Sequence, residues 1–265
     1  MTIQTATAQL ARRALISVSG EDWRSFLQGL ITQDVETVAP GEARFGALLT
    51  PQGRLLFDLF VVGREEGCWL DVAAETRGAL IQRLMIYRLR AKVALAADET
   101  PVWAAWGATP GAGWIADPRL PALGWRGYGV AAEATAGEAA YEAHRLALGV
   151  PGSDDWGTDK AYPIEADFDL LNGIDFKKGC FVGQETTSRM KRRGVIKTRM
   201  LPLVFEGAAP TAGAEVLAGE LRAGEVLAGV EGRAMALLRL DRIGGALAVD
   251  GRAVRVERPD WLPET

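Results

Sequence analysis

Hydrophobic side chains in the first half of the chain recur at two different spacings. Between Trp23 and Leu30 they fall at i, i+3, i+4 and i+7, which places them on one face of a predicted helix. On either side of Pro51-Gln52-Gly53 they form two apolar runs, and this turn sequence predicts a hairpin of two strands. The complete pattern predicts strands at 14–18, 45–50, 55–62 and 68–72, helices at 23–31, 76–89 and 137–148, and short strands and turns over 101–129.

The pattern changes after Met200. Short apolar pieces alternate there with glycine-containing turns, which is typical of a small antiparallel barrel or sandwich. The predicted strands of this part are 201–205, 225–230, 234–240 and 253–256. We therefore expect two domains, 1–197 and 198–265.

The composition is that of an ordinary globular protein, with 48% hydrophobic and 24% charged residues in a chain of 265. A formal net charge of −4 argues against general electrostatic binding to nucleic acid. No apolar run approaches the length of a membrane span, and residues 1–10 lack the basic segment and apolar core of a secretory signal. We expect a monomeric, cytoplasmic protein with no membrane contact and no direct contact to nucleic acid.

Cysteine and histidine are scarce, which limits the chemistry. Cys68 and Cys180 are the two cysteines, they lie far apart without CxxC spacing, and the single histidine is His144. The sequence therefore argues against a disulfide scaffold or a cysteine-only metal site and excludes a multi-histidine metal site. We expect Cys68 to be a core residue and His144 to lie at the surface or at a subdomain interface.

The segment around Cys180 combines a thiol, a cation and glycines ahead of a predicted helix start at Gly183. If residues 178–182 are extended, Lys178 and Cys180 point to the same side. An ammonium group and a helix N-terminus near a thiol favour the reactive thiolate, and Gly179 and Gly183 would let the backbone approach a ligand closely. The alternative is a buried structural cysteine between two turn glycines, and the residues alone leave both interpretations open.

The motif Lys-Gly-Cys-aromatic-x-Gly-Gln-Glu is complete from Lys178 to Glu185, and it resembles the signature of the YgfZ family, a group related to the glycine-cleavage T-protein. Other parts of the chain resemble elements of the same family in the same order. These are FLQGLITQDV at 26–35, the PQGR hairpin within 49–58, YRLRAKV at 87–93, the R-x-x-x-G-x-P element at 145–151 and YPIEA at 162–166. The resemblance thus covers nearly the whole chain.

The resemblance implies an α+β fold of the T-protein type, in which two interleaved α+β subdomains and a C-terminal antiparallel β-barrel surround a central folate cavity. The implied cofactor is tetrahydrofolate or another folate. Glu165 of the P-x-E-A turn would hold the pterin, since a carboxylate can accept two N–H bonds from the pterin amidine edge; the alternative for Glu165 is an N-cap or a surface acid. Cys180 and Lys178 would carry the chemistry, and Gln184 would contact the folate.

Four further residues are candidates for the folate site. Arg189 opens a basic run that ends at Arg193, and it could capture the glutamyl tail of folate or an acidic partner. The alternative for this run is a solvated strand entry, and RNA binding is weakly supported because no aromatic residues accompany it. Tyr87 and Arg90 could line the cavity, although core packing explains Tyr87 nearly as well. Asp34 could be a pocket acid or a cap.

Three classes of function fit these features. The resemblance implies a folate-dependent accessory protein for the assembly or repair of iron–sulfur clusters in client enzymes, including radical enzymes that modify tRNA. The alternatives are a folate-dependent aminomethyltransferase and a non-catalytic folate-binding scaffold. The T-protein has paired aspartates after its hairpin and lacks the Lys-Gly-Cys signature, whereas this chain has Phe57-Asp58 and the full signature, so the first class is favoured over the transferase.

An activated Cys180 thiol distinguishes the first class from a scaffold, which needs none. One cysteine cannot hold a cluster unaided, so the expected partners are iron–sulfur client or assembly proteins.

Overall fold

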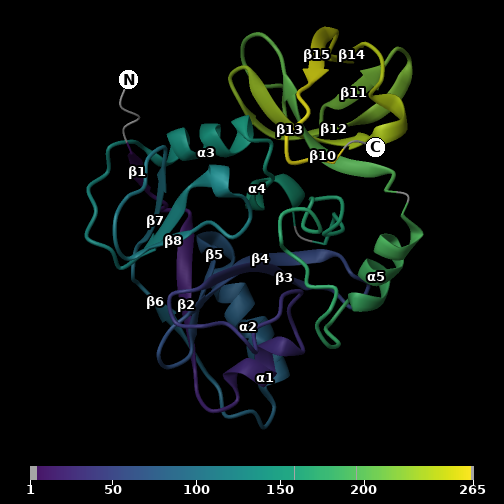
Figure 1. The fold of residues 1–265 in the computed structure, drawn as a ribbon. Coiled ribbons are helices and arrows are strands. Elements are labelled where there is room, and N and C mark those ends of the chain that lie inside the picture. The colour runs from purple at the N-terminus through teal and green to yellow at the C-terminus, as the bar shows by residue number, and fades with distance from the viewer. Residues whose placement is uncertain (1–4, 158, 195, 264–265) are drawn as a thin grey trace.

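The computed structural model describes residues 5–157, 159–194 and 196–263, so residues 1–4 of the N-terminal segment lie outside the described part. The chain forms two antiparallel sheets with helices packed around them, followed by a closed barrel that lies at the top of Figure 1. Mixed helices and antiparallel sheets with a C-terminal barrel are the architecture that the sequence predicted.

The larger sheet has the strand order β3-β4-β5-β2-β6 and contains the predicted hairpin. Across its turn the Thr50 N–H donates to the carbonyl of Arg54 at 2.8 Å, and Gly53 has a φ of +85°, which favours glycine. Side chains such as Leu27 and Leu84 bring the two helices of this subdomain into one apolar cluster with the sheet. The elements are β2 (Arg13–Ser19), α1 (Trp23–Gln28), β3 (Ala43–Leu49), β4 (Leu55–Gly63), β5 (Cys68–Ala73), α2 (Arg77–Arg88) and β6 (Ala94–Asp98).

The smaller sheet shows that the two subdomains are interleaved. Its order is β1-β7-β9-β8, and β1 pairs with β7 in a register that sets Ala8 opposite Ala104. All five strands of the larger sheet lie between these two partners in the sequence, so the predicted interleaving is confirmed. The strands are β1 (Ala6–Gln9), β7 (Val102–Trp106), β8 (Trp114–Ala116) and β9 (Trp125–Tyr128).

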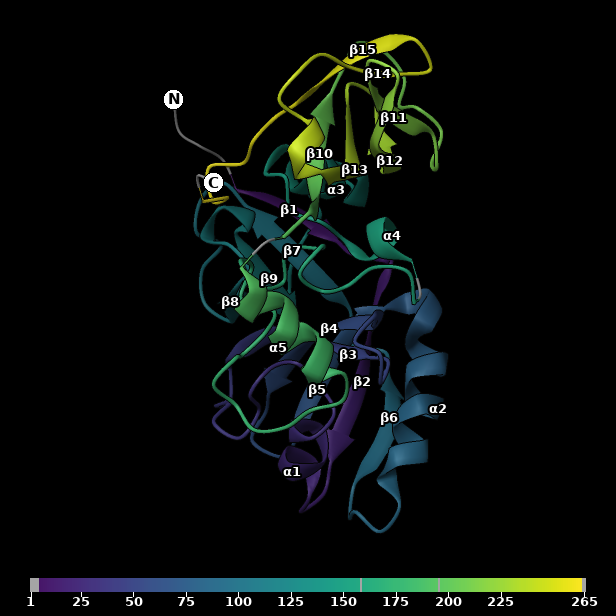
Figure 2. The same cartoon turned by 90° about the vertical axis from the view of Figure 1, so that its right-hand side faces the viewer.

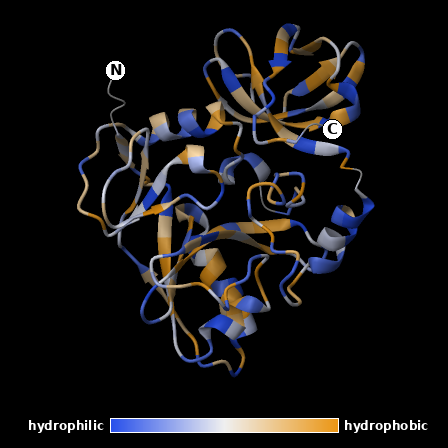
Figure 3. Ribbon diagram, viewed as in Figure 1, coloured by the Kyte–Doolittle hydropathy of each residue, from blue (hydrophilic) through white to orange (hydrophobic). Residues whose placement is uncertain are grey.

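The remaining helices lie between the sheets and the barrel or beside them (Figure 1). They are α3 (Glu138–Ala147), α4 (Ser153–Trp156) and α5 (Gln184–Arg193), with 3-10 turns at Ala74–Thr76, Pro121–Leu123 and Leu240–Arg242. In Figure 3, α5 is largely hydrophilic, in contrast to the hydrophobic β3–β4 hairpin. Among the described residues, no helix has both the length and the apolar character needed to cross a membrane.

The C-terminal strands close into an antiparallel barrel with the order β10-β13-β12-β11-β14-β15, as the alternation of short apolar pieces and glycine turns predicted. Leu203, Val226 and Leu238 are among the side chains that fill it. Closure leaves the sheet without free edges. The strands are β10 (Thr198–Val204), β11 (Glu215–Ala218), β12 (Leu221–Val230), β13 (Arg233–Arg239), β14 (Leu247–Val249) and β15 (Arg252–Val256).

Several local features differ from the sequence predictions. The helix predicted over 23–31 ends at Gln28, and Ile31 instead forms an isolated bridge to Leu48. Strands β1, β6, β11 and β14 and the short helix α4 were not predicted, because three to five residues are too few for a periodicity to show. Cys68 is buried in the core as expected, and His144 stacks on Trp106 with ring centroids 5.6 Å apart.

Buried charges join the two sheets around Asp71 on β5. This carboxylate is fully buried and accepts hydrogen bonds from Arg13, Arg126 and the Tyr128 hydroxyl. Burial alone would raise the pKa of Asp71, but Arg126 and Arg13 outweigh it and hold the pKa below its usual range. The Arg126 guanidinium also lies 4.0 Å from the ring centroid of Phe60. Strands of both sheets thus depend on one carboxylate.

Candidate functional site

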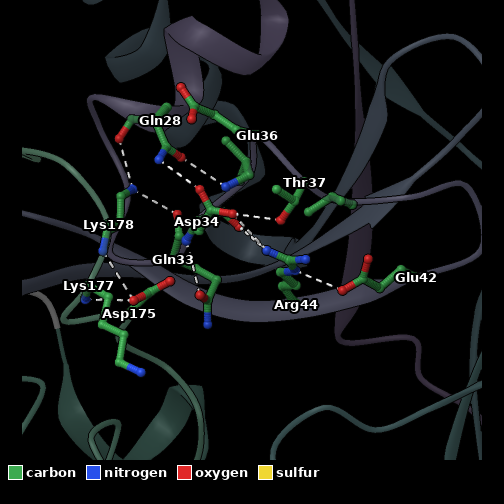
Figure 4. A network of polar contacts seen from close by, with 12 residues as sticks. Gln28, Gln33, Asp34, Glu36, Thr37, Glu42, Arg44, Asp175, Lys177 and Lys178 are labelled. Carbon is green, nitrogen blue, oxygen red and sulfur yellow. Dashed lines mark hydrogen bonds and ion pairs between the residues drawn. The ribbon is translucent and has the colours of Figure 1, made fainter.

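Lys178 anchors the loop that carries Cys180 (Figure 4). Its ammonium donates hydrogen bonds to three backbone carbonyls of the α1–β3 connection, at 2.8 Å to Gln28, 2.7 Å to Ile31 and 2.8 Å to Gln33. An ammonium group has three N–H donors, so these bonds use all of them. Burial lowers the pKa of Lys178 to about 8, although nearby carboxylates act against this effect.

The expected extended segment with Lys178 beside Cys180 is not present. No strand is assigned over 178–182: Lys178 ends a bend that begins at residue 176, and residues 182–183 form a turn, so the alternation of a strand does not apply. The Lys178 ammonium is directed into the α1–β3 connection, whereas Cys180 is exposed. That exposure also excludes the alternative of a buried structural cysteine.

Asp34 supports the connection that binds Lys178. Its carboxylate accepts hydrogen bonds from Gln28, Thr37 and Arg44 (Figure 4). Burial alone would raise the pKa of Asp34, but hydrogen bonds led by those from Thr37 and Gln28 hold it below its usual range. Asp34 lines none of the three cavities described in this section, so its position fits a cap better than a pocket acid.

Two glycines fix the start of α5 against the β3–β4 hairpin turn. Gly183 has a φ of +80°, and a Cβ there would lie 2.6 Å from the carbonyl oxygen of Thr50. A Cβ on Gly53 would lie 2.9 Å from the Cβ of Thr186. Gly183 therefore lets two parts of the protein backbone meet rather than admitting a ligand, whereas the space beside Gly179 is open.

Cys180 lines an open hollow of about 720 Å³ on one flank of α5. Phe176 and Phe181 give this hollow apolar walls, and the Lys191 ammonium lies 5.3 Å from the ring centroid of Phe176. The Gln184 side chain accepts a hydrogen bond from the Phe181 N–H at 2.9 Å, so it fixes the turn that leads into the helix. The lining residues are Pro51, Phe176, Cys180, Phe181, Gly183, Gln184, Glu185, Ser188, Lys191 and Arg192.

Glu165 lines a second cavity, of about 700 Å³, on the other flank of α5. Its carboxylate accepts the Tyr162 N–H at 2.9 Å and the Thr198 hydroxyl at 2.5 Å. Each carboxylate oxygen has two lone pairs, so each can accept a further bond. The lining residues are Tyr162, Glu165, Met190, Arg193, Ile196, Lys197, Thr198 and Arg239. Glu165 is therefore a turn cap that also presents a carboxylate to a cavity.

The other sequence candidates lie elsewhere. Arg189 is exposed on α5 and lines neither cavity, and its neighbours Lys191 and Arg193 take the positions that face the two cavities. Tyr87 lies in the last turn of α2 and Arg90 two residues beyond the helix, and α2 is well apart from α5 in Figure 2. Tyr87 packs against the core beside the larger sheet. The structure thus brings Cys180 and Gln184 together, joins Lys178 and Asp34 in the network that anchors the same loop, and places Glu165 across α5. Tyr87 and Arg90 are separate from this region.

Asp167, two residues after Glu165, is fully buried in an unusual setting. It has a φ of +60°, and its Oδ1 accepts a hydrogen bond from Arg199 at 2.6 Å. No hydrogen-bond partner of its Oδ2 occurs among the described residues. Arg199 is shared with Asp169, which it contacts at 3.0 Å. Burial raises the pKa of Asp167 to about 8, although Arg199 acts against this.

The raised pKa predicts that stability falls as pH rises. Between 3.8 and about 8 the folded protein holds a proton on Asp167 that the unfolded chain has lost, so each step up in pH across this window favours unfolding. Asp167→Asn keeps the shape without the charge, and asparagine tolerates a positive φ. We expect it to flatten this decline and to raise stability at pH 8 by about 1–2 kcal/mol in thermal unfolding. Asp169→Asn is the control and should destabilise at every pH, because it removes the bidentate partner of Arg199.

Known proteins resemble this chain over most of its length. The iron-sulfur cluster assembly factor IBA57, mitochondrial, of Homo sapiens is 32% identical over 304 aligned positions, which cover 97% of this chain and 85% of the human protein. The IBA57 homolog, mitochondrial, of Neurospora crassa is 34% identical over 248 positions, covering 78% of this chain and 56% of that relative. The chain belongs to the IBA57 family.

The sequence motifs resemble the YgfZ family, and the comparisons narrow this resemblance to the IBA57 family. The chain spans 56% of the Neurospora crassa and Coccidioides immitis IBA57 homologs. The CAF17 C-terminal beta-barrel domain family matches residues 197–264. The predicted cytoplasmic location is wrong, because the IBA57 relatives are named mitochondrial proteins.

A solved structure shares the fold. The glycine cleavage system aminomethyltransferase T from Bartonella henselae superposes with a TM-score of 0.76 over 98% of this chain and 87% of that chain, at 17% sequence identity. The predicted T-protein fold is thereby confirmed, and at this identity the likeness concerns the fold alone.

A third cavity contains residues that the sequence analysis missed. It measures about 280 Å³ and lies between the two sheets, α3 and α4. Glu165 is not among its lining residues. Among those that line it are Arg13, Asp58, Phe60, Arg119, Arg126, Tyr141, Arg145 and Trp156. Such residues can be recognised in a sequence as charged residues at inward-facing positions of an apolar strand. Arg126 in β9 (Trp125–Tyr128) is an example.

Proposed function

We propose that this IBA57-family chain is an iron–sulfur cluster assembly factor that acts through the thiol of Cys180. The observation that carries the proposal is an exposed cysteine on a loop held at both ends. Lys178 fastens one side of this loop to the α1–β3 connection, and the Gly53–Gly183 contact fastens the other side to the hairpin turn. A scaffold would have no need to present a thiol so firmly.

In this proposal Lys178 positions Cys180 and does not activate it directly. All three ammonium protons are used by backbone carbonyls, so none is left to stabilise a thiolate. One cysteine cannot hold an iron–sulfur cluster alone, so a partner protein must supply the remaining ligands. The apolar walls and the cations Lys191 and Arg192 around the thiol suit an apolar, acidic partner surface.

Complementation tests the assembly function. We expect the chain, delivered to mitochondria of a Neurospora crassa strain that lacks its IBA57 homolog, to restore the activities of iron–sulfur enzymes, radical enzymes that modify tRNA among the clients to be assayed. Failure of a well-expressed, folded chain to restore any of them would overturn the proposal. A folate-dependent aminomethyltransferase would instead restore glycine cleavage in a strain without T-protein.

We further propose that tetrahydrofolate binds in the cavity of Glu165. The residues there fit its chemistry: a carboxylate with free acceptor capacity for the pterin amidine, the ring of Tyr162 and the side chain of Met190 for the apolar portion, and Arg193 and Lys197 for the glutamyl carboxylates. Bound folate would supply a one-carbon carrier beside α5, the helix whose opposite flank lines the Cys180 hollow.

Glu165→Ala should weaken tetrahydrofolate binding by about 1–3 kcal/mol, the cost of leaving pterin donors unpaired. Isothermal titration under reducing conditions measures the difference. Glu185→Ala is the matched control, because Glu185 is an exposed acid on the other flank of α5. Equal affinity of the wild type and Glu165→Ala would exclude this cavity as the folate site while leaving the role of Cys180 open.

A further inference from the structure

The solvent side of α2 carries no charged residue on its central strip. The positions of this strip are Gly78, Ala79, Gln82, Met85, Ile86 and, directly after the helix, Leu89, which we call the outer α2 face; the exposed Arg83 lies at its border. Met85 is 40% exposed, Ile86 66% and Leu89 88%. Helices that pack on a sheet normally turn polar side chains to solvent. The opposite side of α2 follows that rule and buries Leu80 and Leu84.

Leu89 adds backbone strain to this exposure. It follows the last residue of α2 with φ of 42° and ψ of −106°, a conformation that residues with a side chain rarely adopt. Such strain is unfavourable, and it persists where the surroundings or a function require it. Here the strained backbone keeps the Leu89 side chain in solvent, where it buries no apolar surface against the rest of the chain.

The surroundings of the outer α2 face are basic. Residues 77–97 contain five cations, Arg77, Arg83, Arg88, Arg90 and Lys92, and no aspartate or glutamate. Arg77 pairs with Glu99 and Lys92 pairs with Glu21, whereas no ion pair of Arg83 or Arg90 occurs among the described residues. An apolar strip flanked by free arginines matches a partner with apolar side chains framed by carboxylates.

We propose that the outer α2 face docks an acidic amphipathic helix of another protein. The small side chains of Gly78 and Ala79 leave room for a partner backbone to approach, since no atom outside the adjoining residues and the helix's own backbone lies within 4 Å of a Cβ placed on Gly78. A second copy of this chain does not fit, because a two-fold contact would bring the basic surroundings of this face against the same basic surroundings of the other copy. A membrane surface fits less well, because the face has no aromatic residue to sit at the headgroup level.

This docking surface is separate from the site proposed for Cys180. In Figure 2, α2 lies at the outer side of β6, away from α5. α2 and α5 are separate elements also in Figure 1, where α5 lies at the right-hand edge of the molecule. A partner on α2 would therefore leave the Cys180 hollow open.

The test uses the purified full chain and a synthetic peptide with leucines at i, i+3, i+4 and i+7 and glutamates elsewhere. We expect fluorescence anisotropy to show binding that weakens with salt, and no binding of the same peptide with lysine in place of glutamate. A photoreactive residue in the peptide should crosslink to residues 77–92. Ile86→Glu should weaken binding at least about tenfold, as for an interface anchor.

Two further variants distinguish a specific loss of peptide binding from a loss of folding. Gly78→Gln should also weaken binding, although its side chain meets nothing within this chain. Leu221→Glu, at a leucine 60% exposed on the barrel, should leave binding unchanged. Equal binding of acidic and basic peptides, unchanged affinity of Ile86→Glu, or crosslinks outside residues 77–92 would overturn the proposal. So would cosedimentation with vesicles of phosphatidylcholine and cardiolipin, or a dimer that Ile86→Glu dissociates.

Discussion

Replacement of Cys180 by alanine is expected to reduce the restored iron–sulfur enzyme activities to the level of a strain that carries no copy of the chain. The thiol is the chemical group that the proposal requires, and no other exposed cysteine can replace it, since Cys68 is buried. Stability should hardly change, because Cys180 is exposed and belongs to no core cluster. Tetrahydrofolate titration of the same variant should give the affinity of the wild type.

Cys68→Ala is the matched control for this experiment. Burial raises the pKa of the Cys68 thiol to about 12, so it remains a neutral core side chain and its loss should leave complementation intact. Lys178→Ala should behave like Cys180→Ala, because it removes three hydrogen bonds that fix the loop. Full complementation by Cys180→Ala would refute the proposed role of the thiol.

Replacement of Asp71 by alanine is expected to be the most destabilising single change in the protein, at about 3–5 kcal/mol. The carboxylate is fully buried, and its loss leaves the guanidinium groups of Arg13 and Arg126 without their shared counter-ion. A typical domain has a free energy of unfolding of about 5–15 kcal/mol, so this substitution would remove a large part of it. Urea unfolding followed by circular dichroism measures the difference.

Glu21→Ala controls for the loss of a carboxylate as such. Glu21 pairs with Lys92 at 2.8 Å, but both side chains are more than two-thirds exposed, at 77% and 71%. Exposed pairs of this kind contribute about 0–1 kcal/mol. Equal urea midpoints of Asp71→Ala and Glu21→Ala would show that the pairing of Asp71 with Arg13 and Arg126 does not stabilise the two sheets.

The fold was largely predictable because its main elements carry strong local signals. The spacing of Trp23, Phe26 and Leu27 predicted α1, and Pro51-Gln52-Gly53 predicted the hairpin that the register of β3 and β4 shows. The interleaving of the sheets came from the family resemblance, since the pairing of β1 with β7 joins residues 94 to 100 positions apart and leaves no periodic trace.

The site was less predictable, because side-chain direction in irregular segments depends on tertiary contacts. The alternation argument for Lys178 and Cys180 failed because Lys178 lies in a bend and its ammonium donates to carbonyls of the distant α1–β3 connection. The choice of Arg189 as the leading cation missed the helical geometry that turns Lys191 and Arg193 to opposite flanks of α5. Glu165 was placed in a cavity as expected, but not in the one that lies between the two sheets.

The pairing of β1 with β7 also orders events during synthesis. All five strands of the larger sheet are made before β7, so that sheet can close on α1 and α2 while β1 still lacks its partner. Until Val102–Trp106 emerges, Ala6–Gln9 is an unpaired strand segment, which is the kind of edge through which nascent chains associate with one another. During synthesis, β1 therefore remains without its β7 partner until residues 102–106 have emerged from the ribosome.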